Sequence, residues 1–413
     1  MRSMGTALTS LRKIRCFPQV SLIFAVSSGF MCSSRTLPCV RKVGSLKCGG
    51  GVMRKGTCRS LKKEQSRWVR WMPHPNYEEG FASVVSLWLS VLKWAIWFFS
   101  GGNLHIPVVY KGAPLERAIK EKFKTVIFSH GFGASRFVCS TFCCELASRG
   151  FVVASVEHRD NSACATYYFE SEEAKNNDTC TWIRHKKLEV GPKHYAERRT
   201  QIAIRSKECS QALDLLHSLN SDSVTNILDS STFLNDFKGR LDLSSPTISG
   251  HSFGGATCLQ TLYNDERFHR GVILDCWMFP LKDETHIVVK QPLLFLNSQT
   301  FHIKQNLTAM ERVIKEPADA IRSVFTVKNT THESQTDTPL VWGYWLDLFM
   351  KKLSPELALR IQNHLALVFL HQQLGPDPIN DVGSSERFLS EHKNVLVEGL
   401  MMEAAQEAKR SFL

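Results

Sequence analysis

The sequence predicts an α/β fold in which helices cover both faces of a mostly parallel β-sheet. From residue 125 onward, short β-branched and aromatic runs alternate with stretches of helical periodicity, and glycine or polar residues separate them. Parallel strands need a crossover connection, so this alternation favours a parallel sheet with helices on both faces. The chain has 413 residues, of which 43% are hydrophobic, and this fraction is enough to fill a sizeable core.

The expected elements follow one another regularly along the central part of the chain. Strands are predicted at residues 125–128, 151–156, 247–248, 271–274, 292–296 and 323–327. Helices are predicted up to residue 148, over residues 194–219, from residue 254 onward, and over residues 355–374 and 385–413. The stretch 161–190 is polar and has no clear period, which indicates a loop or a lid.

The formal net charge of +12 is concentrated at the N-terminus. Residues 1–63 contain 13 Lys or Arg and no Asp or Glu, so the rest of the chain has 51 − 13 = 38 basic and 39 acidic side chains. The excess is absent from the body of the protein, and no nucleic-acid partner is expected. We divide the chain into a basic leader or disordered arm (1–63), an α/β-domain (64–380) and a C-terminal helical tail (381–413). The leader fits a signal peptide, an organellar transit peptide or an unstructured arm.

An apolar run at residues 81–99 contains a single charge, Lys93. One helix of this length barely reaches across a bilayer, and three interpretations stay open: a helix on a membrane surface, a buried core helix and a true span. Indole rings favour the boundary between water and lipid, which favours the surface helix. The residues expected to contact a membrane are Trp88, Trp94, Trp97 and Phe98.

The pentapeptide at residues 250–254, GHSFG, fits the pattern G-x-S-x-G between a predicted strand and a predicted helix. In this context the pattern predicts a sharp turn that lifts the Ser252 hydroxyl clear of the sheet as a nucleophile. The glycines on either side admit close backbone contacts. An ordinary glycine-rich turn is the alternative.

A serine nucleophile needs an acid and a histidine, which follow it in that order in α/β hydrolases. Asp275 ends the apolar run 271–274, and His332 follows the strand 323–327, so both are expected at the edge of the sheet that carries Ser252. Asp283 and Glu284 are rival acids in a polar loop. The rival bases are His286 and His302.

The negative charge that develops on a substrate carbonyl oxygen needs preorganised donors. The residue after the nucleophile, Phe253, supplies one amide, and the loop 129–133 (SHGFG) is the candidate for the other, with Phe132 as donor. The alternative for this loop is a structural turn. The sequence has no C-x-x-C pair, phosphate-binding loop, H-E-x-x-H helix or calcium loop. A hydrolase with neither metal nor cofactor is therefore expected.

Four motifs carry a more specific resemblance. They are SHGFGA at 129–134, the stretch 151–160 ending in EHRD, GHSFGGAT at 250–257, and LDCWMFPL at 274–281. Together they resemble the platelet-activating factor acetylhydrolase family over about residues 68–345. The resemblance implies Ser252, Asp275 and His332 as a catalytic triad, with the amides of Phe132 and Phe253 as the oxyanion hole. This sequence departs from the family at Phe132, where the family usually has Leu. It also departs at residues 53–70, a short basic stretch where the family usually has an extended β segment with aromatic residues.

This resemblance implies calcium-independent hydrolysis of the sn-2 acetyl, short or oxidised acyl ester of platelet-activating factor and related phospholipids. It also implies contact with a membrane or lipoprotein surface. CCELASRGFVV at 143–153 and SQTD at 334–337 look more like the intracellular branch, which favours a cytoplasmic, membrane-associated protein over a secreted one. The alternatives are a catalytically silent lipid-binding homologue and a serine lipase, esterase or peptidase of different substrate preference.

Overall fold

The computed structural model describes residues 19–23, 68–86, 88–100, 104–109, 122–189, 191, 193–221, 233–301, 303–342, 352–375 and 382–402. All structural statements below concern these residues. The leader assignments for residues 1–18 and 24–63 and the rival base His302 lie outside them.

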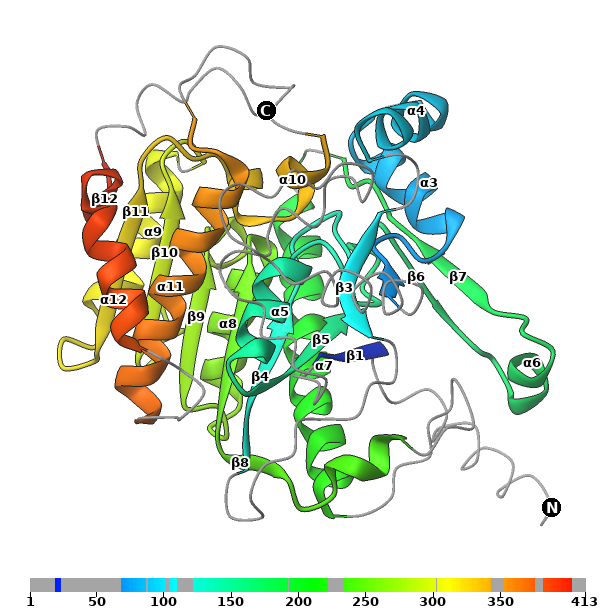
Figure 1. Cartoon of the computed structure of the whole chain (residues 1–413), viewed down its shortest axis with the longest axis horizontal. Helices are drawn as coiled ribbons and strands as arrows, with labels where there is room; N and C mark the ends of the chain where they lie inside the picture. Colours follow the sequence, from blue (N-terminus) through cyan, green and yellow to red (C-terminus); the bar gives the residue numbers. More distant parts are fainter. Residues whose placement is uncertain are drawn as a thin grey trace, which may run out of the picture.

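An eight-stranded sheet in the order β1-β5-β4-β8-β9-β10-β11-β12 forms the centre of the fold (Figure 1). The six inner strands are parallel, while β1 and β12 pair antiparallel at the two edges. The strands are β1 (Gln19–Ile23), β4 (Phe123–Ser129), β5 (Phe151–Glu157), β8 (Leu241–His251), β9 (Arg270–Leu274), β10 (Leu293–Ser298), β11 (Arg322–Val327) and β12 (Leu396–Glu398). The predicted parallel sheet is confirmed, and β1 adds an edge strand from within the basic N-terminal segment.

Helices cover both faces of the sheet, because successive strand residues point to opposite faces. On β4, Ile127 packs into the layer of α7 (His194–Ser221), α8 (Phe253–Asn264) and α9 (Lys304–Lys315). Val126 and Phe128 pack into the opposite layer, against α5 (Ser140–Ser148), α11 (Pro355–Leu374) and α12 (Val382–Glu391). In Figure 1, α11 and α12 lie in front of the sheet. Both faces of the sheet are therefore buried, as the predicted class requires.

The chain order of the strands determines where a site can form. In the sheet, β4 lies between β5, the next strand along the chain, and β8. The loops after β4 and β8 therefore diverge, and the edge between their carboxyl ends is the position at which open α/β sheets bind ligands. Residues 130–133 follow β4 and Ser252 follows β8 at this edge.

The apolar run 81–99 forms two helices instead of the single helix expected. These are α3 (Pro75–Val84) and α4 (Leu89–Ser100), and Ser86 between them has a φ of 54°. Phe81 and Leu92 are buried in a separate cluster that also contains residues of β3 (His105–Val109), while Trp71 after β2 (Trp68–Arg70) joins it. The run divides because each helix buries one side in this cluster. Among the described residues, no helix is long and apolar enough to span a membrane.

Two further segments differ from expectation. Residues 161–190, expected as loop or lid, contain the antiparallel pair β6 (Ala165–Tyr168) and β7 (Thr181–Arg184), with α6 (Glu172–Asn176) between them. The helix expected over 385–413 ends at Glu391, and the chain then forms β12 beside β11. The β-branched Val397 lies at the centre of this short edge strand. The remaining short helices are η2 (Phe233–Phe237), η3 (Phe279–Leu281), η4 (His332–Gln335), α10 (Thr338–Trp342) and η5 (Lys393–Val395).

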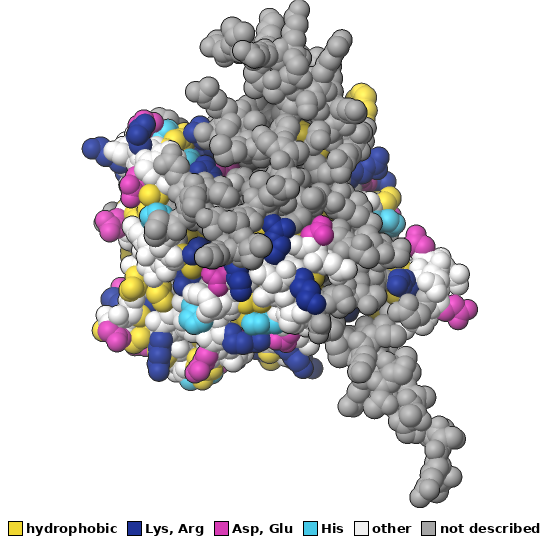
Figure 2. All heavy atoms as spheres, turned by 60° about the horizontal axis from the view of Figure 1, so that its bottom comes forward, with side chains coloured by type: hydrophobic (Ala, Val, Ile, Leu, Met, Phe, Trp, Pro, Cys, Tyr) yellow, Lys and Arg dark blue, Asp and Glu magenta, His cyan; other side chains and the backbone are white. Residues whose placement is uncertain are grey.

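The surface charges of the described residues are mixed in sign. Figure 2 shows Lys and Arg side chains interspersed with Asp and Glu side chains on the face turned toward the viewer. This arrangement agrees with the nearly neutral charge balance of residues 64–413.

Candidate active site

Ser252 occupies a strained turn between β8 and α8. Its φ of 59° and ψ of −116° lie in a region that non-glycine residues rarely adopt. Its amide donates to the carbonyl of Leu274 (2.9 Å), and its own carbonyl accepts from the amide of Trp277 (3.0 Å). The turn is thus bonded, through both the amide and the carbonyl of Ser252, to the end of β9 and to the segment after it, which holds the strained backbone in place.

Two glycines make this turn possible. A Cβ atom on Gly250 would lie 2.5 Å from the carbonyl oxygen of Gly254, and one on Gly254 would lie 2.0 Å from that of Ser129. A side chain on Gly250 would collide with the first turn of α8, and one on Gly254 would push the turn away from β4. The close approach that the motif predicts is therefore present.

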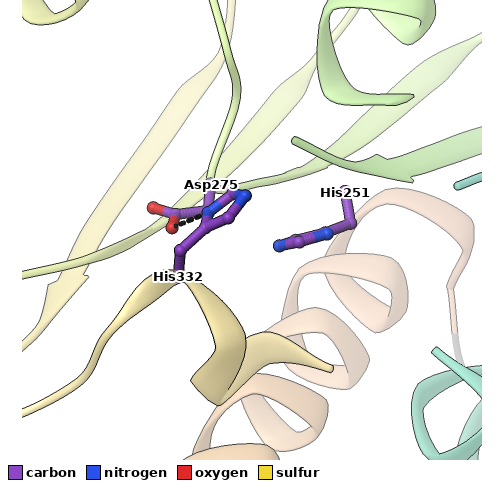
Figure 3. A group of neighbouring side chains, drawn as sticks. All are labelled: His251, Asp275 and His332. Atoms are coloured by element: carbon purple, nitrogen blue, oxygen red, sulfur yellow. Dashed lines mark hydrogen bonds and ion pairs between the residues drawn. The ribbon is translucent and has the colours of Figure 1, made fainter. Parts of the chain in front are cut away.

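Asp275 follows β9 and is fully buried, with a φ of 46°. Its Oδ1 accepts from the amide of Ser298 (2.8 Å), and its Oδ2 accepts from the Ser298 hydroxyl (2.6 Å). The same Oδ2 lies 2.7 Å from Nδ1 of His332 (Figure 3). Since an ionised carboxylate can only accept, Nδ1 carries the ring proton and Nε2 is left as the basic nitrogen.

The His332 ring lies between two other rings. Phe301 stacks on it at 3.6 Å between centroids and 14° between planes, and His251 stacks at 4.4 Å and 30°. His332 is the first residue of η4, which a reciprocal capping interaction between Thr331 and Ser334 fixes. The imidazole is thus held in place by its hydrogen bond to Asp275 and by ring stacking on both of its faces. Nothing in the sequence indicated Phe301 or His251 as partners, because both are distant from His332 along the chain.

His251 is buried beside Ser252, and its Nε2 has no hydrogen-bond partner among the described residues. Burial, followed by the charge of His332, lowers the pKa of His251 to about 3. His251 therefore stays neutral at physiological pH, so His332 can gain a proton without a second charged ring beside it.

The candidate oxyanion residues lie next to Ser252. A Cβ on Gly131 would lie 3.2 Å from the Cβ of Ser252, so the loop after β4 approaches the serine closely. Phe253 is the first residue of α8, where an amide has no partner within the helix. The Phe132 and Phe253 rings both face Trp277, at centroid distances of 6.2 and 5.6 Å. These three rings therefore form an aromatic cluster beside Ser252, in which Phe253 is fully buried and Phe132 and Trp277 are half-buried.

The rival residues belong to other interactions. Glu284 pairs with Arg199 (2.9 Å) and accepts from the Tyr195 hydroxyl. Asp283 is exposed beside Lys282 (3.8 Å), while the exposed His286 lies near Glu284 (3.5 Å). The structure thus brings Asp275 and His332 together and leaves these three residues elsewhere.

His251, Asp275 and His332 also offer three donor atoms within 4.8 Å of one another, which raises the question of a metal site. Two imidazoles and a carboxylate suit zinc. However, Oδ2 of Asp275 already accepts from Nδ1 of His332 and from the Ser298 hydroxyl, and Oδ1 accepts from the Ser298 amide. The existing bonding of the carboxylate fits an acid–histidine pair better than a metal ligand.

Asp337 connects the His332 loop to α5 and β2. Its buried carboxylate accepts from the amides of Ser140 (2.8 Å) and Thr141 (3.0 Å), from the Ser140 hydroxyl, and from Nε1 of Trp71 (3.2 Å). Burial raises the pKa of Asp337, although these donors act in the opposite direction. It therefore caps a helix nearly 200 residues away in sequence and fixes the segment that follows His332.

We expect Asp337→Ala to lower the free energy of unfolding by about 3 kcal/mol, because it leaves several buried donors unpaired. Urea denaturation measures this. Asp214→Ala, which removes an exposed partner of Arg267, is the control and should change the free energy of unfolding by less than about 1 kcal/mol. Equal effects from the two variants would contradict the anchoring role.

A mostly parallel sheet with a strained serine turn at a carboxyl edge defines an α/β hydrolase. Residues 56–390 match the sequence profile described as platelet-activating factor acetylhydrolase, isoform II. The chain belongs to this family.

Curated relatives agree with the assignment. Platelet-activating factor acetylhydrolases from Cavia porcellus, Bos taurus and Gallus gallus are 37%, 36% and 35% identical to this chain. The alignments cover 74%, 74% and 77% of this chain and 69%, 68% and 76% of the relatives. A ferulic acid esterase structure from Streptomyces cinnamoneus covers 70% of this chain and 76% of its own, with a TM-score of 0.47 and 20% identity. This last match is too weak to support the fold assignment, which rests on the strand order and the serine turn described above.

Proposed function

We propose that this chain is a carboxylic ester hydrolase that degrades platelet-activating factor, with Ser252, His332 and Asp275 as its catalytic triad. The contact that carries the proposal is the 2.7 Å hydrogen bond from His332 Nδ1 to Asp275, at the same edge of the sheet as the strained serine turn. Membership of the family supports the substrate class.

In the proposed mechanism, Nε2 of His332 takes the proton of the Ser252 hydroxyl as its oxygen attacks the sn-2 carbonyl carbon. Asp275 holds the imidazole in the correct tautomer and stabilises its positive charge. The amides of Phe132 and Phe253 stabilise the negative oxygen of the tetrahedral intermediate. The alcohol leaves with the proton from His332, and water then hydrolyses the acyl-enzyme by the same route.

The proposed preference for a short or oxidised acyl group rests on the aromatic cluster of Phe132, Phe253 and Trp277, whose half-buried members Phe132 and Trp277 would face the acyl group. The Phe132 ring is itself held by Arg198, whose Cζ lies 4.3 Å from the ring centroid. A bulky ring in this fixed position narrows the space beside Ser252 more than a leucine would.

The test of the function is acetate release from a 2-acetyl ether phospholipid, in the presence of excess EDTA. We expect activity that EDTA does not reduce, because the proposed steps need no calcium. Lack of acetate release would overturn the proposed substrate, and loss of activity with EDTA alone would overturn calcium independence.

We further propose that α4 meets a membrane or lipoprotein surface. Trp88, Trp94 and Trp97 are 77%, 59% and 63% exposed, although tryptophan is usually mostly buried. Val91 is also exposed, so apolar side chains recur along the helix. The fourth predicted residue, Phe98, lies in α4, but its side chain is outside the described part of the chain.

We expect the double variant Trp94→Ser/Trp97→Ser to bind phosphatidylcholine vesicles about 10- to 100-fold more weakly, since each indole contributes apolar area buried on binding. Vesicle co-sedimentation measures this. Turnover of water-soluble p-nitrophenyl acetate should stay unchanged. Tyr263→Ser, at an exposed aromatic residue of α8, is the matched control, and equal vesicle binding by all three proteins would contradict the assignment of α4.

A further inference from the structure

Arg205 is a fully buried cation on α7 that the proposed mechanism does not use. Its side chain is 0% exposed, yet it contacts the loop after β4. Its Nη1 donates to the carbonyl oxygen of His130 (2.7 Å), and its Nη2 lies 3.5 Å from that of Gly131. Burial of a guanidinium costs free energy unless its N–H groups find acceptors. The loop after β4 supplies two of these acceptors.

The guanidinium is itself held in a fixed orientation. Nε donates to Oδ2 of Asp160 (2.9 Å), and Nη2 donates to the hydroxyl of Ser162 (2.6 Å). That hydroxyl in turn contacts both carboxylate oxygens of Asp160. Arg205, followed by His158 and Ser162, lowers the pKa of Asp160 against the effect of burial. The pair therefore stays ionised, and the planar fork of Arg205 can point only toward the loop.

The Gly131 carbonyl is part of the same peptide unit as the Phe132 amide. In a trans peptide the C=O and the N–H point in opposite directions within one plane. His130 Nδ1 (2.8 Å) and the Ala134 amide (3.4 Å) also bond this carbonyl. The donors that fix the carbonyl on one side therefore fix the direction of the Phe132 N–H on the other.

Arg205 also contacts the second proposed donor residue. Its Cζ lies 4.4 Å from the centroid of the Phe253 ring. A single guanidinium thus contacts both elements of the oxyanion hole, one through backbone carbonyls and the other through a cation–π contact.

We propose that Arg205 is a positioning residue that aligns the Phe132 and Phe253 amides toward the oxyanion, with Asp160 and Ser162 orienting its guanidinium. This inference rests on the proposed oxyanion role of those amides. The guanidinium of Arg205 bonds Asp160, Ser162 and the loop after β4, so in this proposal it acts on the reaction only through the oxyanion residues.

Arg205→Lys tests the proposal, because lysine keeps the charge beside Asp160 but lacks the planar fork. With p-nitrophenyl acetate as substrate, we expect kcat to fall roughly 100-fold, the effect of one displaced oxyanion donor. KM should stay within about threefold, because the amides act on the transition state. A trifluoromethyl ketone, which forms a tetrahedral adduct with the serine, should bind weaker by a factor similar to the loss of kcat/KM.

Arg270→Lys is the matched control. Arg270 is also buried and bonds a backbone carbonyl, that of Ser245 (2.7 Å), but it lies at the start of β9, away from the site. The Arg270→Lys variant should have a lower free energy of unfolding, measured by urea denaturation, while keeping the kcat of the wild type. If Arg205→Lys keeps kcat within threefold, or loses kcat no more than Arg270→Lys, the proposal is wrong.

Ser162→Ala decides the matter if Arg205→Lys does not fold. It removes one partner of the guanidinium and should lower kcat several-fold at unchanged KM, while an unchanged kcat would overturn the proposal. The soluble ester separates this test from that of the substrate. If the wild type hydrolyses p-nitrophenyl acetate but not the phospholipid, only the proposed substrate fails.

Discussion

Ser252→Ala should lower kcat for acetate release by roughly 10⁴-fold or more, because it removes the nucleophile that forms the acyl-enzyme. The fold should persist, since the turn is held by backbone bonds from Ser252 to Leu274 and Trp277 that alanine can also make. Steady-state kinetics and urea denaturation of the same preparation separate the two effects.

The matched control is Ser249→Ala on β8, the strand that leads into the Ser252 turn. Ser249 is also buried, and its hydroxyl donates to the carbonyl of Val272 (2.9 Å). This variant should keep its kcat within a few-fold. If both variants lost activity equally, the effect of Ser252→Ala would reflect damage to β8 and not loss of a nucleophile.

Asp275→Asn is expected to have the second largest effect, a fall in kcat of roughly 10⁴-fold. Both oxygens of the carboxylate accept hydrogen bonds, from Ser298 and from His332 Nδ1, whereas asparagine has a single accepting oxygen and a donating NH2 group. The imidazole then loses the partner that keeps its proton on Nδ1, so Nε2 is no longer reliably available as a base. Kinetics with p-nitrophenyl acetate measure the loss without interference from vesicle binding.

Ser298→Ala is the graded control for this variant. It removes one hydroxyl donor to Asp275 but leaves the carboxylate and the Ser298 amide in place, so we expect a loss of only about tenfold. Near wild-type activity of Asp275→Asn would contradict the triad. Asp283→Asn and Glu284→Gln would then be the variants to measure.

Local sequence patterns were sufficient to predict most of the sheet and the serine turn. The β-branched runs predicted five of the six inner strands nearly to their ends, because four of these runs are buried on both faces and the half-buried β11 is equally rich in β-branched and aromatic residues. The exception is β8, expected at 247–248 but extending over Leu241–His251. The G-x-S-x-G pattern predicted a sharp turn at Ser252, and the positive φ of Ser252 is the backbone conformation of that turn. Asp275 and His332 were predicted from their order and from the family motifs, and the structure brings them into contact.

Other features depend on contacts between distant segments, which no local pattern contains. The apolar run 81–99 has no strong helix breaker, and it divides at Ser86 because α3 and α4 both pack into the cluster around Trp71. β12 exists because β11 offers it an edge. Arg205 looked like an ordinary helix residue, and only the fold brings it to His130, 75 positions away.

The proposed triad makes Ser252 the reactive nucleophile of this fold. Treatment of the native protein with a fluorophosphonate, followed by peptide mass spectrometry, tests it directly. We expect one adduct per chain on Ser252, little or none in His332→Ala, and loss of esterase activity in proportion to labelling. An adduct on another residue, or full activity after complete labelling of Ser252, would contradict the account.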